Sequence, residues 1–195
     1  MTPADYATLA ARAYTERPTL GLESSAARAV VFEPGVVGFP GTNNVACWLA
    51  DLDVATVPVP GLGRLHAGFW HAYCSIRDAL MARTDVVVTL GHSEGAALAL
   101  LYAADLCNAG KPPAAVFAFE PPRVSTDGTL AALFAVHGVA LTLTQNGNDV
   151  VPEVPRLCEA WQHPGPLQHI GRARLPFPNV DDHMIDRVVA ALTAA

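Results

Sequence analysis

Charged residues are scarce in this chain, and they do not gather in long runs. They make up 15% of the 195 residues, with a formal net charge of −6. A nucleic-acid-binding domain normally carries a basic stripe, and none is visible here, so nucleic acid is excluded as a partner. A disordered chain is excluded as well, because hydrophobic residues make up 51% of the sequence.

Long apolar runs are also missing. Asp5, Arg12, Glu16 and Arg17 interrupt the first residues, which therefore lack the apolar stretch of a secretory signal. The longest uncharged apolar stretch within a predicted helix, Ala96 to Ala104, is too short to span a bilayer. The sequence thus predicts no transmembrane segment. It predicts a cytoplasmic protein, or a secreted one if a leader was trimmed from it.

Cysteine is rare, and no two cysteines form a C-x-x-C pair. Because zinc and redox sites are typically built on such pairs, the sequence predicts no metal site. An even number of thiols permits two disulfides in three alternative pairings, but we expect four free thiols, buried or partly buried. The four are Cys47, Cys74, Cys107 and Cys158.

Short apolar runs bounded by Gly, Pro or Asp are typical of buried strands, and stretches with helical spacing lie between them. From residue 86 onward strands and helices alternate, which predicts parallel strands joined by crossover helices. The two runs around Pro34–Gly35 predict a hairpin. The expected strands are Ala29–Phe32, Val36–Phe39, Val54–Val57, Val86–Leu90, Ala115–Phe119 and Val139–Thr144. The expected helices are Ala67–Ala82, Gly95–Asn108, Thr129–Val136 and Asp182–Thr193.

These elements predict an α/β fold with a mixed, mostly parallel sheet flanked by helices. The chain contains no internal repeat and no low-complexity linker. At this length it fits one compact domain, so we expect a single domain over residues 1–195.

The sharpest local motif is Gly91-His92-Ser93-Glu94-Gly95, directly after a Val-rich predicted strand and directly before an Ala-rich predicted helix. This is G-x-S-x-G in the strand–turn–helix context of a nucleophile elbow. The turn is sharp, and glycines on both sides of the serine relieve the crowding. The motif therefore predicts Ser93 as a nucleophile.

A serine needs a base and an orienting acid, which follow it in the order acid, then histidine, on this kind of elbow. Asp149 comes just past a predicted strand, where sites on parallel sheets collect. His183 begins the last predicted helix. We therefore predict a Ser93–Asp149–His183 triad. Asp181 and Asp182 are alternative acids, but an immediate chain neighbour of His183 is poorly placed to bond its ring.

The chain resembles the class 3 (fungal-type) lipase family of the α/β-hydrolase superfamily. The resemblance covers about residues 28–190, and its specificity comes from seven motifs in the family's order rather than from any one of them. The motifs are Phe39-Pro40-Gly41-Thr42, Trp48-Leu49-Ala50-Asp51-Leu52, His66-Ala67-Gly68-Phe69 with Ala72-Tyr73, Gly91–Gly95, Pro122-Arg123-Val124, Asn148-Asp149-Val150-Val151-Pro152 and Asp182-His183.

The resemblance implies a role for each matching residue. Ser93 would attack an ester carbonyl, His183 would accept its proton, and Asp149 would hold the His183 tautomer. Thr42 and the backbone N–H of Glu94 would form the oxyanion hole. The stretch Asn43–Trp48 would be a short lid, with Val45 and Trp48 as its apolar residues.

The chain departs from the family pattern at three places. Pro40 replaces an arginine, and Glu94 replaces a leucine directly beside the nucleophile. Glu120-Pro121-Pro122 replaces a glycine-containing sequence. A carboxylate at Glu94 would repel the negative charge that develops on an oxyanion unless it points away or is neutralised.

The function expected from these residues is hydrolysis of an acyl ester, as in a lipase or esterase of lipid metabolism, without a cofactor. The substrate would be a small acyl ester or a lipid, with transient contact to a lipid surface. Acyl transfer or thioester hydrolysis on the same triad is one alternative. A non-catalytic hydrolase-like domain that binds a ligand or partner is another, favoured by Glu94. The oligomeric state is left open.

Overall fold

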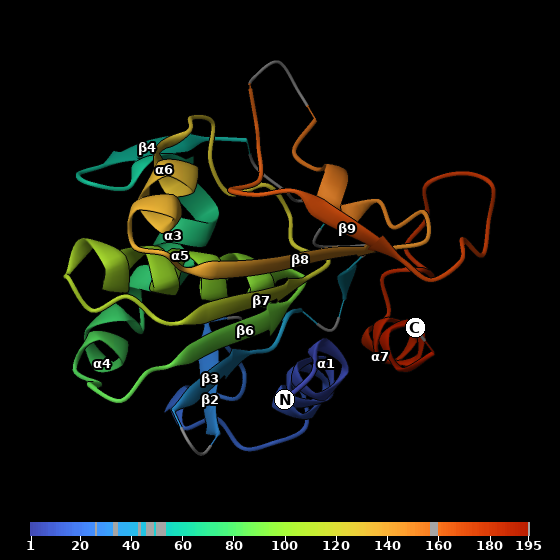
Figure 1. Cartoon of the computed structure of the whole chain (residues 1–195), viewed down its shortest axis with the longest axis horizontal. Helices are drawn as coiled ribbons and strands as arrows, with labels where there is room; N and C mark the ends of the chain where they lie inside the picture. The colour runs from blue at the N-terminus through green and yellow to red at the C-terminus, as the bar shows by residue number, and fades with distance from the viewer. Residues whose placement is uncertain are drawn as a thin grey trace.

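The centre of the molecule is a mixed sheet (Figure 1). The computed structural model describes residues 1–25, 27–32, 35–42, 44–45, 49, 54–156 and 160–194. The sheet has the order β1-β2-β3-β6-β7-β8-β9. Its strands are β1 (Leu20–Gly21), β2 (Arg28–Phe32), β3 (Val36–Phe39), β6 (Val88–His92), β7 (Ala115–Phe119), β8 (Ala140–Asn146) and β9 (Leu167–Ile170). The pairs β1–β2 and β2–β3 are antiparallel, and the other pairs are parallel. The predicted hairpin and the predicted mostly parallel sheet are confirmed.

Helices cover both faces of this sheet (Figure 1). On one face, α5 (Glu94–Asn108) packs on β3, β6 and β7, with α3 (Ala67–Cys74) and α6 (Thr129–Val136) against it. The short α4 (Arg77–Met81) follows α3. On the other face, α1 (Pro3–Ala13) packs against α7 (Ile185–Thr193); α1 contacts β3, β6 and β7, and α7 contacts β8 and β9.

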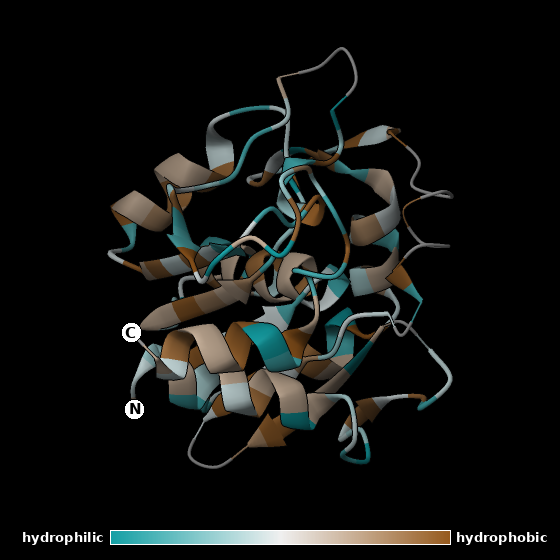
Figure 2. Ribbon diagram, turned by 90° about the vertical axis from the view of Figure 1, so that its right-hand side faces the viewer, coloured by the Kyte–Doolittle hydropathy of each residue, from teal (hydrophilic) through white to brown (hydrophobic). Residues whose placement is uncertain are grey.

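Two hydrophobic cores follow from these layers. Neighbouring residues of a strand point to opposite faces, so Val37 and Phe39 pack with α5, whereas Val36 packs with α1. All of α5 except its last residue is buried, as expected for an Ala- and Leu-rich helix without a polar stripe. By contrast, hydrophobic and hydrophilic residues alternate along α1 and α7, the two helices nearest the marked termini in Figure 2.

Several predicted elements need correction. The predicted strand Val54–Val57 is not in the central sheet: β4 (Thr56–Val59) pairs with β5 (Gly63–His66) in a separate hairpin, and Val54 is 41% exposed. The predicted helix Ala67–Ala82 is broken into α3 and α4. The predicted helix from Asp182 begins only at Ile185, because Met184 before it has the extended backbone of an N-cap and the His183 N–H bonds the Val180 oxygen in a turn.

Two of the four cysteines fall within the described residues. Cys74 is exposed and Cys107 is buried, and both are free thiols. Cys47 and Cys158 lie outside the described residues. Among the residues that the structure describes, no helix is long and apolar enough to cross a membrane.

Candidate active site

Ser93 is the single residue that connects β6 to α5. Its backbone has φ 59° and ψ −131°, a conformation that costs an ordinary residue free energy. The flanking glycines are required by contact: a Cβ on Gly91 would lie 2.2 Å from the Gly95 carbonyl oxygen, and one on Gly95 would lie 2.2 Å from the Phe39 oxygen. The turn therefore holds Ser93 at the carboxyl end of β6, on top of the first turn of α5.

The structure brings Asp149 and His183 together from positions 34 residues apart. Nδ1 of His183 lies 2.6 Å from Oδ2 of Asp149, and both residues are fully buried. The other carboxylate oxygen of Asp149 accepts the backbone N–H of Val151 at 3.0 Å. The carboxylate is thus fixed from both sides, and it fixes the ring in the tautomer that leaves Nε2 free to accept a proton.

The proton-transfer atoms of Ser93 and His183 have no hydrogen-bond partner among the described residues. Oγ of Ser93 and Nε2 of His183 are both buried, and neither forms a hydrogen bond with any described residue, including each other. Serine–histidine hydrogen bonds are often long before substrate binds. Acyl transfer requires a serine hydroxyl as nucleophile and a neutral histidine nitrogen as base, and these two atoms are not engaged by other described residues.

The chain before His183 is held by Asp182, the alternative acid. Its carboxylate accepts the N–H groups of Asn148 at 3.0 Å and of Arg174 at 3.0 and 3.1 Å, and it pairs with Arg187 at 3.1 Å. Asp182 makes no bond to the His183 ring among these contacts. It ties the segment that carries His183 to the turn that carries Asp149.

His92 forms hydrogen bonds to the backbone of His183 and to Tyr14. Its Nε2–H donates to the backbone oxygen of His183 at 2.7 Å, so its Nδ1 accepts the Tyr14 hydroxyl at 2.7 Å. Burial and the neighbouring His183 hold the pKa of His92 well below its usual 6.5, which keeps the ring neutral for these bonds. A neutral His92 therefore links the end of α1 to the backbone of His183.

Thr42 and Glu94, the predicted oxyanion donors, follow two neighbouring strands of the sheet, β3 and β6. Thr42 follows β3, the neighbour of β6, and its Oγ1 accepts the N–H of Asn44 at 3.3 Å. Glu94 is the first residue of α5, and N–H groups of a first helical turn have no carbonyl partner within the helix. Burial raises the pKa of the Glu94 carboxyl, and the nearby Arg28 opposes this.

A cavity of about 480 Å³ opens beside His183. The end of α1, the residues Thr42 and Val45, and the chain between Val180 and Asp186 line it. Val45 therefore faces the space next to the site. Trp48, the other predicted lid residue, lies outside the described residues.

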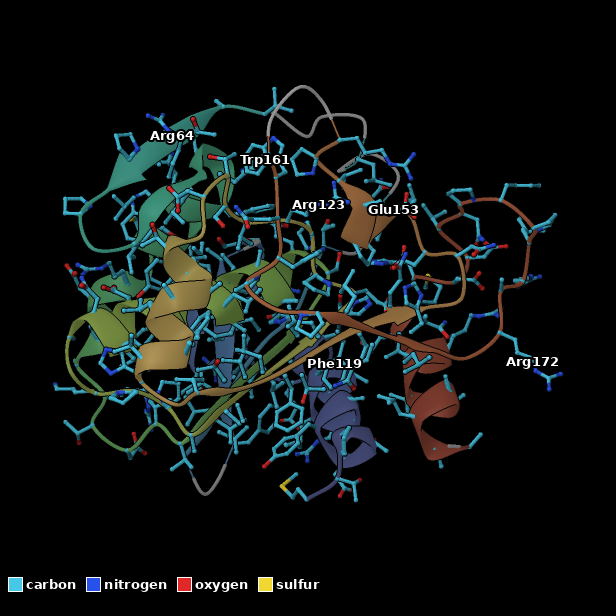
Figure 3. The ribbon with its side chains drawn as sticks, turned by 45° about the horizontal axis from the view of Figure 1, so that its top comes forward. Arg64, Phe119, Arg123, Glu153, Trp161 and Arg172 are labelled. Atoms are coloured by element: carbon cyan, nitrogen blue, oxygen red, sulfur yellow. The ribbon has the colours of Figure 1, made fainter. Side chains whose placement is uncertain are left out.

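Two residues near the site were not assigned a part in it from the sequence. Tyr14 caps the C-terminal end of α1, a helix that the sequence did not indicate, and no local pattern marks it. Glu120 follows Phe119, which Figure 3 labels beside α1. Its only signal was a departure from the family's glycine-containing sequence.

Comparisons with known proteins agree with this architecture. The model of the family described as lipase (class 3) matches residues 36–158. The secreted mono- and diacylglycerol lipase A of Penicillium cyclopium is 34% identical over 143 residues, which cover 67% of this chain and 46% of that protein. A lipase of Rhizomucor miehei is 31% identical over 143 residues, covering 65% of this chain and 39% of that protein. The chain spans about half the length, or less, of these curated relatives.

Solved structures share the fold. A lipase from Rhizopus microsporus var. chinensis has a TM-score of 0.71 at 22% identity, covering 93% of this chain and 84% of that one. The triacylglyceride lipase of Rhizomucor miehei has a TM-score of 0.71 at 20% identity, covering 93% and 91%. The predicted α/β-hydrolase fold is thus confirmed.

One prediction is wrong. A cytoplasmic location was expected because no leader is visible at the start of the sequence, but the Penicillium relative is named a secreted lipase. The start of the sequence carried no information on this point. The family match over residues 36–158 includes Ser93 and Asp149, and together with the identity to the Penicillium protein it shows that the chain belongs to the class 3 lipase family.

Proposed function

We propose that the chain is a serine carboxylic-ester hydrolase that cleaves an acyl ester through an acyl-enzyme. One observation carries the proposal: the fully buried Asp149–His183 pair at 2.6 Å is bonded through the His183 backbone to His92, the residue before a strained Ser93 whose Oγ has no partner among the described residues. Family membership and the fold support the same chemistry.

The proposed reaction follows from the positions of the three side chains. Oγ of Ser93 attacks the ester carbonyl while Nε2 of His183 accepts its proton, and Asp149 stabilises the imidazolium that forms. The same proton then passes to the leaving alcohol. Water, deprotonated by His183, releases the acid from Ser93 in the second half of the reaction.

Two backbone regions would stabilise the oxyanion. The N–H groups of Thr42 and Glu94 lie at the end of β3 and the start of α5, and each such donor is worth about 3–4 kcal/mol in the transition state. The positive end of the α5 dipole points toward the same place. Burial of the Glu94 side chain raises the pKa of its carboxyl, which weakens its tendency to carry a charge beside the oxyanion.

The substrate we propose is an ester of a short or medium acyl chain or of a lipid, held in the cavity of about 480 Å³ beside His183. Val180 and Met184, which line this cavity, are 36% and 56% exposed. Such apolar side chains suit transient contact with a lipid surface. Because the Penicillium relative is named a secreted mono- and diacylglycerol lipase, we infer that this protein also acts outside the cell.

The test is hydrolysis of p-nitrophenyl esters with acyl chains from acetyl to dodecanoyl. We expect Ser93→Ala to lower kcat by about 10,000-fold or more. Ser75→Ala, which removes an exposed hydroxyl at the end of α3, should leave the rate unchanged. Equal inactivity of wild type and Ser93→Ala on every ester would refute the proposed hydrolase and favour a binding domain.

A further inference from the structure

Glu120 is a buried acid in a place that disfavours it. It follows β7 with φ 53°, a left-handed conformation that costs a non-glycine residue free energy, and its exposed fraction is 0%. The family has a glycine-containing sequence at this turn, and glycine would pay neither cost. Because backbone strain and burial both cost free energy, we expect the Glu120 carboxyl to have a specific interaction partner that offsets them.

The contacts of Glu120 lead to the turn that carries Asp149. Its two carboxyl oxygens lie 3.0 and 2.9 Å from the backbone nitrogen of Asn146, whose N–H they accept. One of them also lies 3.3 Å from Oγ1 of Thr144. Its own backbone N–H donates to the Thr144 oxygen at 3.1 Å. Glu120 is thereby fastened to the end of β8, directly before Asp149.

Besides Asn146 and Thr144, the Glu120 carboxyl has Asp149 as a neighbour. Burial, a hydrogen bond with Asp149 and the charge of Asp149 raise the pKa of Glu120 well above its usual 4.5. Two carboxyl groups that share a buried site cannot both ionise without a large cost. Asp149 has the His183 ring and a backbone N–H to stabilise a negative charge. Among the described residues, no cationic side chain lowers the pKa of Glu120.

We propose that Glu120 is a positioning residue of the catalytic apparatus: as a neutral carboxylic acid it donates a hydrogen bond to Asp149 and fixes the carboxylate that orients His183. This inference rests on the proposed function of the Ser93–Asp149–His183 set. Asp149 is then held by Glu120, by the Val151 N–H and by His183, which leaves its carboxylate little freedom to turn. A neutral Glu120 also keeps a second negative charge away from Asp149.

The kinetic test compares Glu120→Gln with Glu120→Leu. Glutamine retains an N–H donor toward Asp149 and an acceptor toward Asn146, so we expect kcat within about 3-fold of wild type. Leucine has a similar size but no donor, and we expect kcat to fall by about 10- to 100-fold, since a misplacement of ~1 Å can cost about 100-fold. KM should stay within about 2-fold in both, because Glu120 does not touch the cavity. Equal kcat in wild type and Glu120→Leu would overturn the inference.

The pH profile of kcat/KM separates positioning from packing, because its acidic limb reports protonation of the catalytic base. Replacing a neutral acid by a neutral amide should leave this limb in place in Glu120→Gln. In Glu120→Leu, Asp149 loses a donor and attracts the imidazole proton more strongly, so the limb should move to higher pH. A limb that moves to lower pH in Glu120→Gln would show that Glu120 is ionised in wild type, and would overturn the inference.

Asp105 provides a matched control. It is 3% exposed and bonded to Tyr73 and Arg77 at 2.8 and 2.6 Å, but it lies about 18 Å from Ser93 along α5. Asp105→Asn should lower stability without moving the acidic limb. A limb that moves equally in Asp105→Asn and Glu120→Leu would identify the effect as general loosening and would count against positioning.

An infrared difference spectrum of wild type minus Glu120→Gln at neutral pH tests the protonation without any substrate. We expect the carbonyl stretch of a buried, protonated carboxylic acid, and its absence would overturn the inference. If this band is present but wild type and Ser93→Ala are equally inactive on esters, the proposed function fails and the inference of catalytic positioning fails with it. If Ser93→Ala alone is inactive and the band is absent, only the inference about Glu120 fails.

Discussion

At the scale of single residues, backbone strain coincides with chemistry. Among the described residues, Ser93 and Glu120 are the non-glycine residues with positive φ, at 59° and 53°. They follow the neighbouring parallel strands β6 and β7, and the Ser93 N–H donates to the Phe119 oxygen at 3.0 Å. Strain of this kind persists only where the surrounding structure fixes it. Here it is found at one predicted nucleophile and at one buried acid.

The strain at Ser93 predicts an inverted order of stability for two inactive variants. Glycine adopts φ 59° without cost, whereas alanine does not. We expect Ser93→Gly to exceed Ser93→Ala in free energy of unfolding by about 1 kcal/mol, because relief of ~1–3 kcal/mol of strain outweighs the entropy cost of glycine. Urea denaturation measures the difference.

Ser75 is the control, because at an unstrained residue the glycine variant should be less stable than the alanine variant. It has φ −65° at the end of α3, so Ser75→Gly should be less stable than Ser75→Ala by about 0.5–1 kcal/mol. If the two pairs of variants showed the same order, Ser93 would carry no strain that glycine relieves.

At the scale of elements, contact between α5 and β3 depends on Gly95. In an exposed helix, Gly→Ala usually stabilises by up to about 1 kcal/mol. Here a new Cβ would lie 2.2 and 2.6 Å from the backbone oxygens of Phe39 and Pro40, which cannot rotate away. We expect Gly95→Ala to destabilise the protein by about 3 kcal/mol, measured by thermal or urea unfolding.

Gly128 is the control for Gly95. It is the N-cap residue before α6 with φ −78°, and an added Cβ would meet nothing within 4 Å. Gly128→Ala should change stability by less than about 1 kcal/mol. Similar losses at both glycines would mean that the approach of α5 to β3 is looser than the contact distances indicate.

Elements with strong local patterns could be predicted from the sequence. The ranges of β7 and α6 agree with the predicted Ala115–Phe119 and Thr129–Val136, because Gly, Pro and charged residues bound those apolar runs. The helix α1 was not expected, since its polar residues were considered only as evidence against a leader. Its pattern nonetheless buries Ala7, Leu9, Ala10 and Ala13 against the sheet.

The site was predictable where a motif names the residue. Ser93, Asp149 and His183 could be chosen from the elbow and the chain order, and the structure brings the last two into contact. Tyr14 and Glu120 reach the site by the packing of α1 and by the strained end of β7. Contacts of that kind depend on tertiary structure, which no local pattern specifies.

At the scale of the whole molecule, two buried titratable groups set opposite pH dependences of stability. Burial lowers the pKa of His92, so below its usual 6.5 the unfolded chain binds a proton that the folded chain refuses. Its contribution to stability is therefore present above pH 6.5 and lost as pH falls toward the lowered value. Glu120 behaves in the opposite way, because its folded pKa is raised.

The raised pKa of Glu120 predicts that Glu120→Gln gains stability relative to wild type as pH rises. Below the usual pKa of 4.5, Glu120 is protonated in both the folded and the unfolded chain, and the difference between the two proteins is constant. Above 4.5 the unfolded chain releases this proton while the folded chain retains it. Wild type then loses up to about 1.4 kcal/mol per pH unit until the folded group ionises. Glutamine has no such loss, and the His92 contribution cancels in the comparison.

Urea unfolding between about pH 4 and pH 8 measures this difference directly. Ser93→Ala removes no ionisable group, so its difference from wild type should stay flat over the same range. Curves for wild type and Glu120→Gln that run parallel above pH 4.5 would mean that the folded protein carries an ionised Glu120. Asp149 would then lie beside a second buried negative charge, and its hydrogen bond to His183 would form without a neutral donor behind it.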